Sequence, residues 1–175
     1  MKLLKWIIPI VIIIVVVFVL FRLQDTPQVL TINDRLMEFR LKTLEGDYFF
    51  SNEHKGKVML VSVWDTYCVY CIDEMVFIEG LNNELCKENF LAVSLLKNDN
   101  NIGGAKNITE KNNITYTALN DSDGKVSDML GAKVTPYCVL IDSKGIIRFI
   151  HRGYSKSIGK KIEEEVRLLI EESKE

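Results

Sequence analysis

The pattern of apolar and polar positions divides the chain into a long apolar run at its start and a series of short periodic segments after it. No charged residue interrupts the run from Trp6 to Phe21, and residues 3–23 are long enough to cross a bilayer as a helix. The residues just after this run offer no small-x-small cleavage site of a signal peptide. We therefore expect residues 1–23 to form a retained transmembrane anchor; a cleaved signal and a buried soluble helix are the alternatives.

The segment after the apolar run is polar, and a periodic pattern begins only later. Residues 24–36 carry Pro27 and are predicted to form a short tether. Residues 37–175 are expected to form one domain, which begins with a β-hairpin over residues 37–50. The alternating pattern of this hairpin turns three apolar side chains inward: Phe39, Leu41 and Phe49.

Strands and helices are expected to alternate through the rest of the domain, a pattern typical of an α/β fold. Residues 58–64 are almost wholly apolar, as expected of a central strand covered on both faces. Further strands are expected at residues 90–96, 114–116, 137–141 and 146–150. Helices are expected from the first cysteines to about residue 85, over residues 103–112 and 124–131, and at the C-terminus, where Ser157 is the expected N-cap.

Four cysteines stand at positions 68, 71, 86 and 138. Cys68 and Cys71 are too close in the sequence to stabilise the fold by closing a long loop, so reversible pairing is expected. At a helix N-terminus the backbone N–H groups stabilise the Cys68 thiolate, while Cys71, one turn further, can attack a mixed disulfide. A chance CxxC or half of a zinc site is the alternative. Cys138 is expected to face inward from a strand as a small apolar side chain, and Cys86 to be a packed or partly exposed free thiol; a redox role is the alternative for each.

Charge narrows the range of partners. Of the 22 basic residues three lie in the first 23 positions, which leaves 19 basic against 24 acidic residues, a net charge of about −5 for the rest of the chain. Nucleic acid is therefore not an expected partner. Basic residues flank the apolar run on both sides, so the positive-inside rule does not decide the orientation. An N-terminal anchor most simply leaves the domain outside the cytoplasm.

Residues 64–75, Trp-Asp-Thr-Tyr-Cys-Val-Tyr-Cys-Ile-Asp-Glu-Met, resemble the active-site segment of the TlpA/ResA group of membrane-anchored thiol–disulfide oxidoreductases. That group belongs to the thioredoxin-like superfamily and has a redoxin/AhpC-TSA-type domain. Residues 56–57, 131–136 and 140–145 match further segments in order, so the resemblance covers about residues 37–170. It implies an α/β thioredoxin-like fold, in which helices flank a central mixed β-sheet, with an N-terminal β-hairpin extension and one N-terminal transmembrane helix.

Carried over by position, the resemblance implies a role for each of four residues. Cys68 is the nucleophile, Cys71 the resolving thiol, Pro136 the cis-proline facing them and Glu74 the acidic residue near the pair. An ordinary trans bond at Pro136 and a plain surface charge at Glu74 are the alternatives. Ser62 stands where thioredoxin has a buried acid, so proton handling is expected to rest on Glu74, on water or on both. The residues expected to contact the client are Trp64, Tyr67, Val69, Tyr70 and Thr135.

The function predicted from these observations is disulfide reduction in client proteins by a single-pass membrane protein whose domain is extracytoplasmic. The Cys68–Cys71 pair is expected to act without a further cofactor, and the chain to be a monomer. The resemblance implies a membrane electron donor of the CcdA/DsbD type. No Lys or Arg lies between Lys57 and Lys87, and carboxylates near the pair disfavour the thiolate, which favours a reductant over an oxidant.

Two other functions that occur on this fold match the sequence motifs less well. A peroxiredoxin-like peroxidase would need the pattern Pro-x-x-x-Thr/Ser-x-x-Cys, but Val61 and Asp65 occupy those two positions. A Sco-like copper-carrying module uses Cys-x-x-x-Cys and a histidine ahead of a later strand. This chain has Cys-x-x-Cys and no histidine between His54 and His151.

Overall fold

The computed structural model describes residues 11–18 and 29–174. Residues 11–18 are helical and exposed. Within the described residues, no helix combines the length and apolar character that a membrane span requires. The expected anchor over residues 1–23 falls largely outside these residues, as do positions 24–28 of the expected tether.

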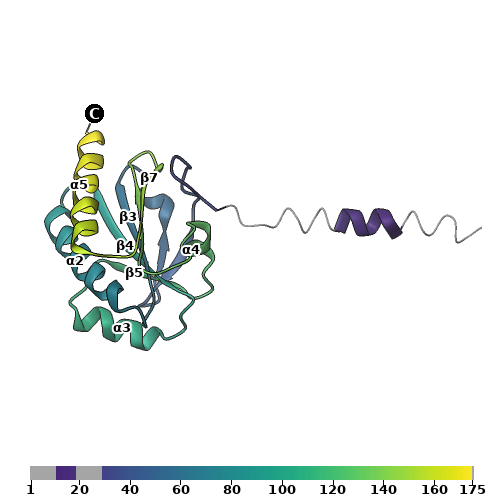
Figure 1. Ribbon diagram of the computed structural model, residues 1–175, viewed down its shortest axis with the longest axis horizontal. Helices are drawn as coiled ribbons and strands as arrows, with labels where there is room; N and C mark the ends of the chain where they lie inside the picture. The colour runs from purple at the N-terminus through teal and green to yellow at the C-terminus, as the bar shows by residue number, and fades with distance from the viewer. Residues whose placement is uncertain (1–10, 19–28, 175) are drawn as a thin grey trace, which may run out of the picture.

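A mixed β-sheet forms the centre of the domain (Figure 1). Its seven strands lie in the order β2-β1-β5-β4-β3-β6-β7. β3, β4 and β5 run parallel, and the other neighbouring strands pair antiparallel. β3 lies between β4 and β6 with all seven of its residues buried, which confirms the predicted central strand. The strands are β1 (Arg40–Thr43), β2 (Tyr48–Phe50), β3 (Val58–Trp64), β4 (Phe90–Lys97), β5 (Thr117–Asp121), β6 (Tyr137–Ile141) and β7 (Ile147–Arg152).

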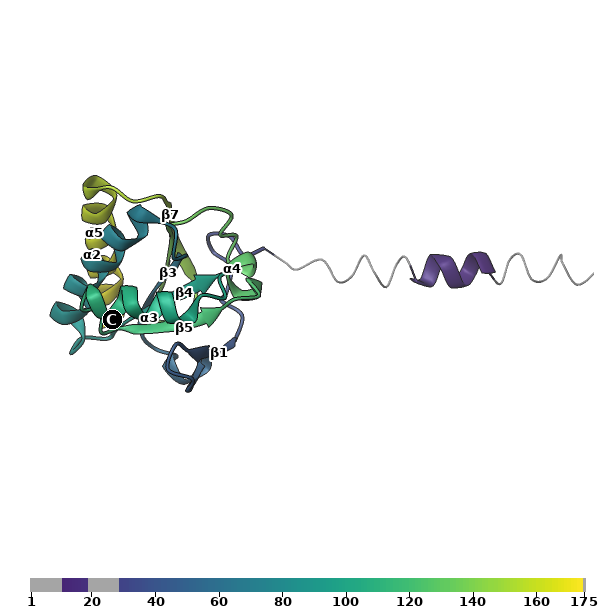
Figure 2. The same ribbon diagram turned by 90° about the horizontal axis from the view of Figure 1, so that it is seen from below.

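Helices cover both faces of this sheet. Those on one face are α2 (Val69–Leu85), α3 (Ile102–Lys111) and α5 (Lys156–Glu172), and the short α4 (Lys125–Met129) covers the other. Figures 1 and 2 show α2 beside α5, with α4 across the sheet from them. Alternate side chains of β3 point to opposite faces of the sheet. Val61 and Val63 pack with residues of α4, and Leu60 packs under α2 and α5. The arrangement confirms a mixed sheet flanked by helices.

The N-terminal hairpin is present as predicted, but the segment before it is not a free tether. β1 and β2 pair antiparallel, and Phe49 is buried. Leu30 is also buried, and its N–H donates to the carbonyl of Met129 at 2.8 Å. The N–H of Leu36 donates to the carbonyl of Gly145 at 2.8 Å. Residues 29–36 therefore pack on the domain, because two leucines reach its core.

The strand expected at residues 114–116 begins instead at Thr117, opposite Val93 of β4. The carboxylate of Glu79 on α2 accepts the backbone N–H of Thr115 at 2.7 Å and its hydroxyl at 2.6 Å. It also accepts the N–H of Tyr116 at 3.4 Å. These backbone groups bond to a side chain from a helix, so strand pairing starts only after them.

Ser155, and not the expected Ser157, caps α5. The Ser155 hydroxyl oxygen accepts the N–H of Ile158 at 3.3 Å, and the Ser155 backbone is extended. We expect Ser155→Ala to lower the free energy of unfolding by about 1 kcal/mol, because the last helix loses its cap. Ser157→Ala is the matched control and should change it by less than about 0.5 kcal/mol. Urea denaturation measures both values, and equal losses would contradict the assignment.

Candidate active site

A disulfide joins Cys68 and Cys71 at the start of α2. Cys68 is the N-cap residue, and its sulfur accepts the backbone N–H of Cys71 at 3.2 Å. Cys68 is partly exposed, whereas Cys71 is fully buried. A sulfur atom of another protein can therefore reach Cys68, and Cys71 can react only through Cys68.

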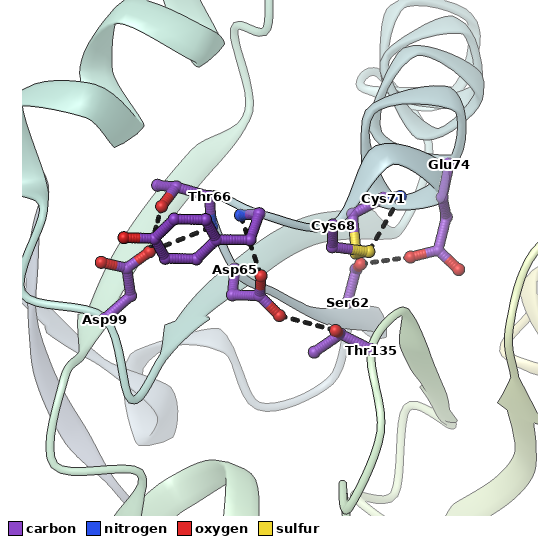
Figure 3. The surroundings of a disulfide bond; sticks show 9 residues. Ser62, Asp65, Thr66, Cys68, Cys71, Glu74, Asp99 and Thr135 are labelled. Carbon is purple, nitrogen blue, oxygen red and sulfur yellow. Dashed lines mark hydrogen bonds between the residues drawn. A yellow bond between two sulfur atoms is a disulfide. The ribbon is translucent and has the colours of Figure 1, made fainter.

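The loop that leads from β3 to the disulfide is held by two aspartates. Asp65 follows β3 and accepts the N–H of Tyr67 at 3.0 Å. Asp99 follows β4 and accepts both the N–H of Thr66, at 3.0 Å, and its hydroxyl. Burial alone would raise the pKa of Asp99, but hydrogen bonds from Thr66 and Asn101 together lower it below its ordinary value. The loop is therefore fixed to the end of the neighbouring strand, as Figure 3 shows.

The loop that enters β6 lies against the same segment. The Thr135–Pro136 peptide bond is cis, as predicted. The Thr135 hydroxyl donates to Asp65 at 2.6 Å, and the Pro136 carbonyl accepts the N–H of Gly153 at 2.8 Å. The cis-proline loop is thus tied directly to the loop that carries Cys68 (Figure 3).

Glu74 is fully buried and follows Cys71 by one helical turn. The Ser62 hydroxyl donates to Oε2 of Glu74 at 2.5 Å, whereas Oε1 has no protein partner in the described part of the chain. Burial raises the pKa of Glu74 to about 7, against the effect of the Ser62 hydrogen bond. The surface-charge alternative for Glu74 is therefore wrong. A carboxyl group with this pKa can gain or lose a proton near neutral pH.

Three of the expected client-contacting residues are prominent on the surface. Tyr67, Val69 and Tyr70 are 85%, 73% and 66% exposed. Val134, which the sequence did not single out, is also 54% exposed. Its position two residues before Pro136 is the signal that could have found it.

Trp64 departs from the expectation. Its side chain is fully buried and packs with Cys71 and Met75 below the disulfide. As the last residue of β3 it points to the face that α2 covers. Trp64 therefore supports the disulfide from inside and offers no surface to a client in this structure.

Comparison with known proteins decides the family of the chain. The sequence pattern of the Redoxin family matches residues 31–166. The chain belongs to the Redoxin family. This match covers every site residue described above and confirms the resemblance seen in the sequence.

Two named proteins are similar to this chain in sequence. A thiol:disulfide interchange protein DsbE of Vibrio cholerae serotype O1 is 30% identical over 118 residues, 66% of this chain and 62% of that protein. The thioredoxin-like protein YneN of Bacillus subtilis (strain 168) is 30% identical over 117 residues, 66% of this chain and 68% of that protein. This chain thus spans about three fifths of the length of the DsbE protein.

A solved structure confirms the thioredoxin-like fold of this Redoxin family member. A thiol:disulfide interchange protein of the thioredoxin family from Chlorobium tepidum matches with a TM-score of 0.70 at 18% identity. The match covers 80% of this chain and 98% of that one.

The two remaining cysteines of this Redoxin family member are free. Cys138 faces inward from β6 and is fully buried, as expected of a small apolar side chain. Cys86, which follows α2, is exposed. Among the described residues, no three or more His, Cys, Asp or Glu side chains are grouped to hold a metal ion.

Proposed function

We propose that this chain is a thiol–disulfide oxidoreductase. The observation that carries the proposal is the partly exposed Cys68 bonded to the buried Cys71 at the N-terminus of a helix. In the reduced protein, the Cys68 thiolate attacks one sulfur of a client disulfide, and a client thiolate leaves. Cys71 then attacks the Cys68 sulfur and releases the second client thiolate. Two electrons pass to the client, and the Cys68–Cys71 disulfide forms.

Glu74 is the proposed acceptor of the proton that Cys71 loses in the second step. Its burial, its position one turn from Cys71 and its pKa of about 7 support this role. Pro136 is the proposed cis-proline that faces the pair, on the loop bound to Asp65 through Thr135.

The client is proposed to bind over the exposed side chains around Cys68. Tyr67, Val69 and Tyr70 form an apolar surface there, and an open depression of about 380 Å³ adjoins it. Tyr67, Val134 and Thr135 line the depression together with five polar or charged residues: Asp65, Lys97, Asn98, Asp99 and Lys133. The exposed apolar side chains suit an apolar segment next to the client's disulfide, and the depression suits a polar part of the same client.

The proposed direction in the cell is reduction, because the charges near the pair disfavour a thiolate on Cys68. Asp65 precedes the pair by three residues and the exposed Asp73 follows it, while residues 58–86 contain no Lys or Arg. Of the two lysines that line the adjoining depression, Lys97 is paired with Asp128 at 2.7 Å, and Lys133 works against this effect. The disulfide form is then comparatively stable, so the dithiol gives up electrons readily. A membrane electron donor of the CcdA/DsbD type is the proposed source of those electrons.

Residues 1–23 are the proposed membrane anchor, with the domain on the extracytoplasmic side as a monomer. The uninterrupted apolar run supports the anchor, and the disulfide suits an oxidising compartment. Labelling of intact cells with a membrane-impermeant thiol reagent tests the orientation. We expect reduced Cys68 to be labelled, and labelling only after permeabilisation would contradict this orientation.

Catalysis by the purified full chain tests the activity. In detergent micelles, it should accelerate the reduction of insulin disulfides by dithiothreitol, without consuming peroxide and without binding copper. Peroxide consumption would favour the peroxidase alternative, and stoichiometric copper binding would favour the copper-carrying one. No acceleration of insulin reduction would overturn the proposal.

A further inference from the structure

A row of polar side chains crosses the sheet under α2 and α5. The strand register places Ser62 of β3 opposite Ser94 of β4 and Cys138 of β6, and Cys138 opposite His151 of β7. Residues paired in this way point to the same face of a sheet, so the four side chains form one row. The neighbouring positions on this face are apolar: Leu60, Ala92 and Leu140 on one side of the row, and Trp64 and Leu96 on the other.

The end of the row at β4 contains buried polar atoms without a protein partner. They are Oε1 of Glu74, the hydroxyl of Ser94 and the hydroxyl of Tyr116. Nε1 of Trp64, the next residue of β3 on this face, is a fourth such atom and lies toward the end of the strand. Glu74 and Ser94 are 0% exposed, and Tyr116 is 6% exposed. The Ser94 and Tyr116 hydroxyls lie close enough for Ser94 to act on the pKa of Tyr116, but their geometry does not make a full hydrogen bond. A buried polar group left unpaired costs about 1–3 kcal/mol, so the three groups together call for a common partner. A buried water makes two to four hydrogen bonds and is the smallest molecule that can serve all three.

The opposite end of the row needs no such partner. Nε2 of His151 lies 2.5 Å from Oε2 of Glu165 on α5, and both side chains are about nine-tenths buried. Ser62 already donates to Glu74. The unpaired groups therefore lie toward β4 and Tyr116 and toward the end of β3 at Trp64, and among the described residues none lies toward His151.

We propose that Ser94 and Tyr116 hold a buried water molecule against the free oxygen of Glu74 and through it fix the protonation of that carboxyl group. The water donates to Oε1 of Glu74 and accepts from the Tyr116 hydroxyl, with Ser94 as its third partner. Because it donates to the carboxylate, it favours the charged form of Glu74. Ser94 and Tyr116 are thus positioning residues that act through Glu74.

The water matters for the proposed exchange reaction, on which this inference rests. When the Cys71 sulfur bonds to Cys68, the Cys71 thiol loses its proton and the client thiolate leaves with the electron pair. Glu74 accepts that proton only if it is a carboxylate at that moment. A water that stabilises the carboxylate keeps more of the protein ready for this step near neutral pH.

Two of the other titratable groups around Glu74 stay protonated near pH 7. Burial, with the nearby carboxylates, raises the pKa of Tyr116 and of Cys138 well above their ordinary values, so both stay protonated. Burial also raises the pKa of Tyr154, which lies near Glu74. The charged or titratable side chains that complete the surroundings are Glu79 and Asp73 on α2, Glu165 on α5 and His151 on β7.

Direct titration of the Glu74 carboxyl group tests the proposal. The oxidised full chain, labelled with ¹³C at glutamate side chains and held in detergent micelles, is followed by NMR from pH 4 to pH 9, and Glu74→Gln assigns the signal. We expect Tyr116→Phe and Ser94→Ala each to raise the pKa of Glu74 by roughly half a unit or more. Tyr137→Phe is the matched control, because its hydroxyl donates to the Leu130 carbonyl on the opposite face of the sheet. It should leave the titration unchanged.

An unchanged or lowered pKa in Ser94→Ala and Tyr116→Phe would overturn the proposal. If Tyr116→Phe does not fold, Ser94→Ala decides alone. A high-resolution crystal structure should show water density within hydrogen-bond distance of Glu74, Ser94 and Tyr116, and a site without density would also overturn it. Both measurements use the oxidised protein without a client, so their outcome is independent of whether the chain reduces disulfides.

Discussion

Cys68→Ser is expected to abolish disulfide exchange, whereas Cys71→Ser should attack clients and remain bound to them. A serine hydroxyl is not ionised near neutral pH, so the first variant lacks its nucleophile. We expect its activity to fall by at least about three orders of magnitude. In Cys71→Ser, the partly exposed Cys68 can still form a mixed disulfide, but no second thiol is present to release it.

Non-reducing gels and mass spectrometry of cells that express each variant measure the trapped complexes. Cys86→Ser is the matched control, since Cys86 is exposed and free but lies beyond the other end of α2. It should behave like the unchanged protein. Equal trapping by Cys68→Ser and Cys71→Ser would contradict the assigned roles.

Glu74→Gln is expected to make the folded protein more stable above pH 7 and the exchange reaction slower. Burial raises the pKa of Glu74 from an ordinary value of 4.5 to about 7. Between these two values the folded chain holds a proton that the unfolded chain has lost, so the free energy of unfolding falls as pH rises through this window. Above pH 7 the free energy of unfolding falls no further, and the total decrease is on the order of 3 kcal/mol for this fully buried group.

The neutral glutamine has no charge to bury, so its stability should not fall across this window. Urea denaturation of the oxidised protein at pH 5 and pH 8 measures the difference, and the variant should exceed the unchanged protein only at pH 8. Resolution of mixed disulfides should slow by roughly a hundredfold, because the proton acceptor is gone. If Glu74→Gln raised the free energy of unfolding equally at the two pH values, the result would contradict a raised pKa of Glu74.

Glu79→Gln is a useful comparison for this measurement. Glu79 is also buried on α2, but its carboxylate accepts hydrogen bonds from Thr115 and Tyr116. Replacing it weakens those bonds, so we expect lower stability at both pH values. Within the described part of the chain, Glu74 has one unpaired carboxyl oxygen, whereas Glu79 is hydrogen-bonded through both. Comparing the two variants shows how this difference affects stability.

The sequence predicted the features that depend on local pattern. The almost wholly apolar β3 could be recognised because a strand covered on both faces has few polar positions, here only Ser62. Cys68 could be placed at the start of α2 because the apolar residues that follow it recur at helical spacing. The hairpin of β1 and β2 followed from alternation around a glycine-containing turn.

The features that the sequence missed depend on contacts between distant residues. The start of β5 is set by Glu79, which lies 36 residues before Thr115. Segment 29–36 packs on the domain because Leu30 and Leu36 meet core residues from later elements. The burial of Trp64 and Glu74 depends on how α2 lies over the sheet, which no local pattern specifies.

The reduction potential of the Cys68–Cys71 pair tests the central claim most directly. The full chain is equilibrated with glutathione and dithiothreitol buffers, and the fraction of disulfide is measured by thiol alkylation. We expect a reversible two-electron titration, with a potential nearer to the roughly −270 mV of thioredoxin than to the roughly −120 mV of DsbA. A potential as oxidising as that of DsbA, or a disulfide that exchanges with neither buffer, would contradict a thiol–disulfide reductase.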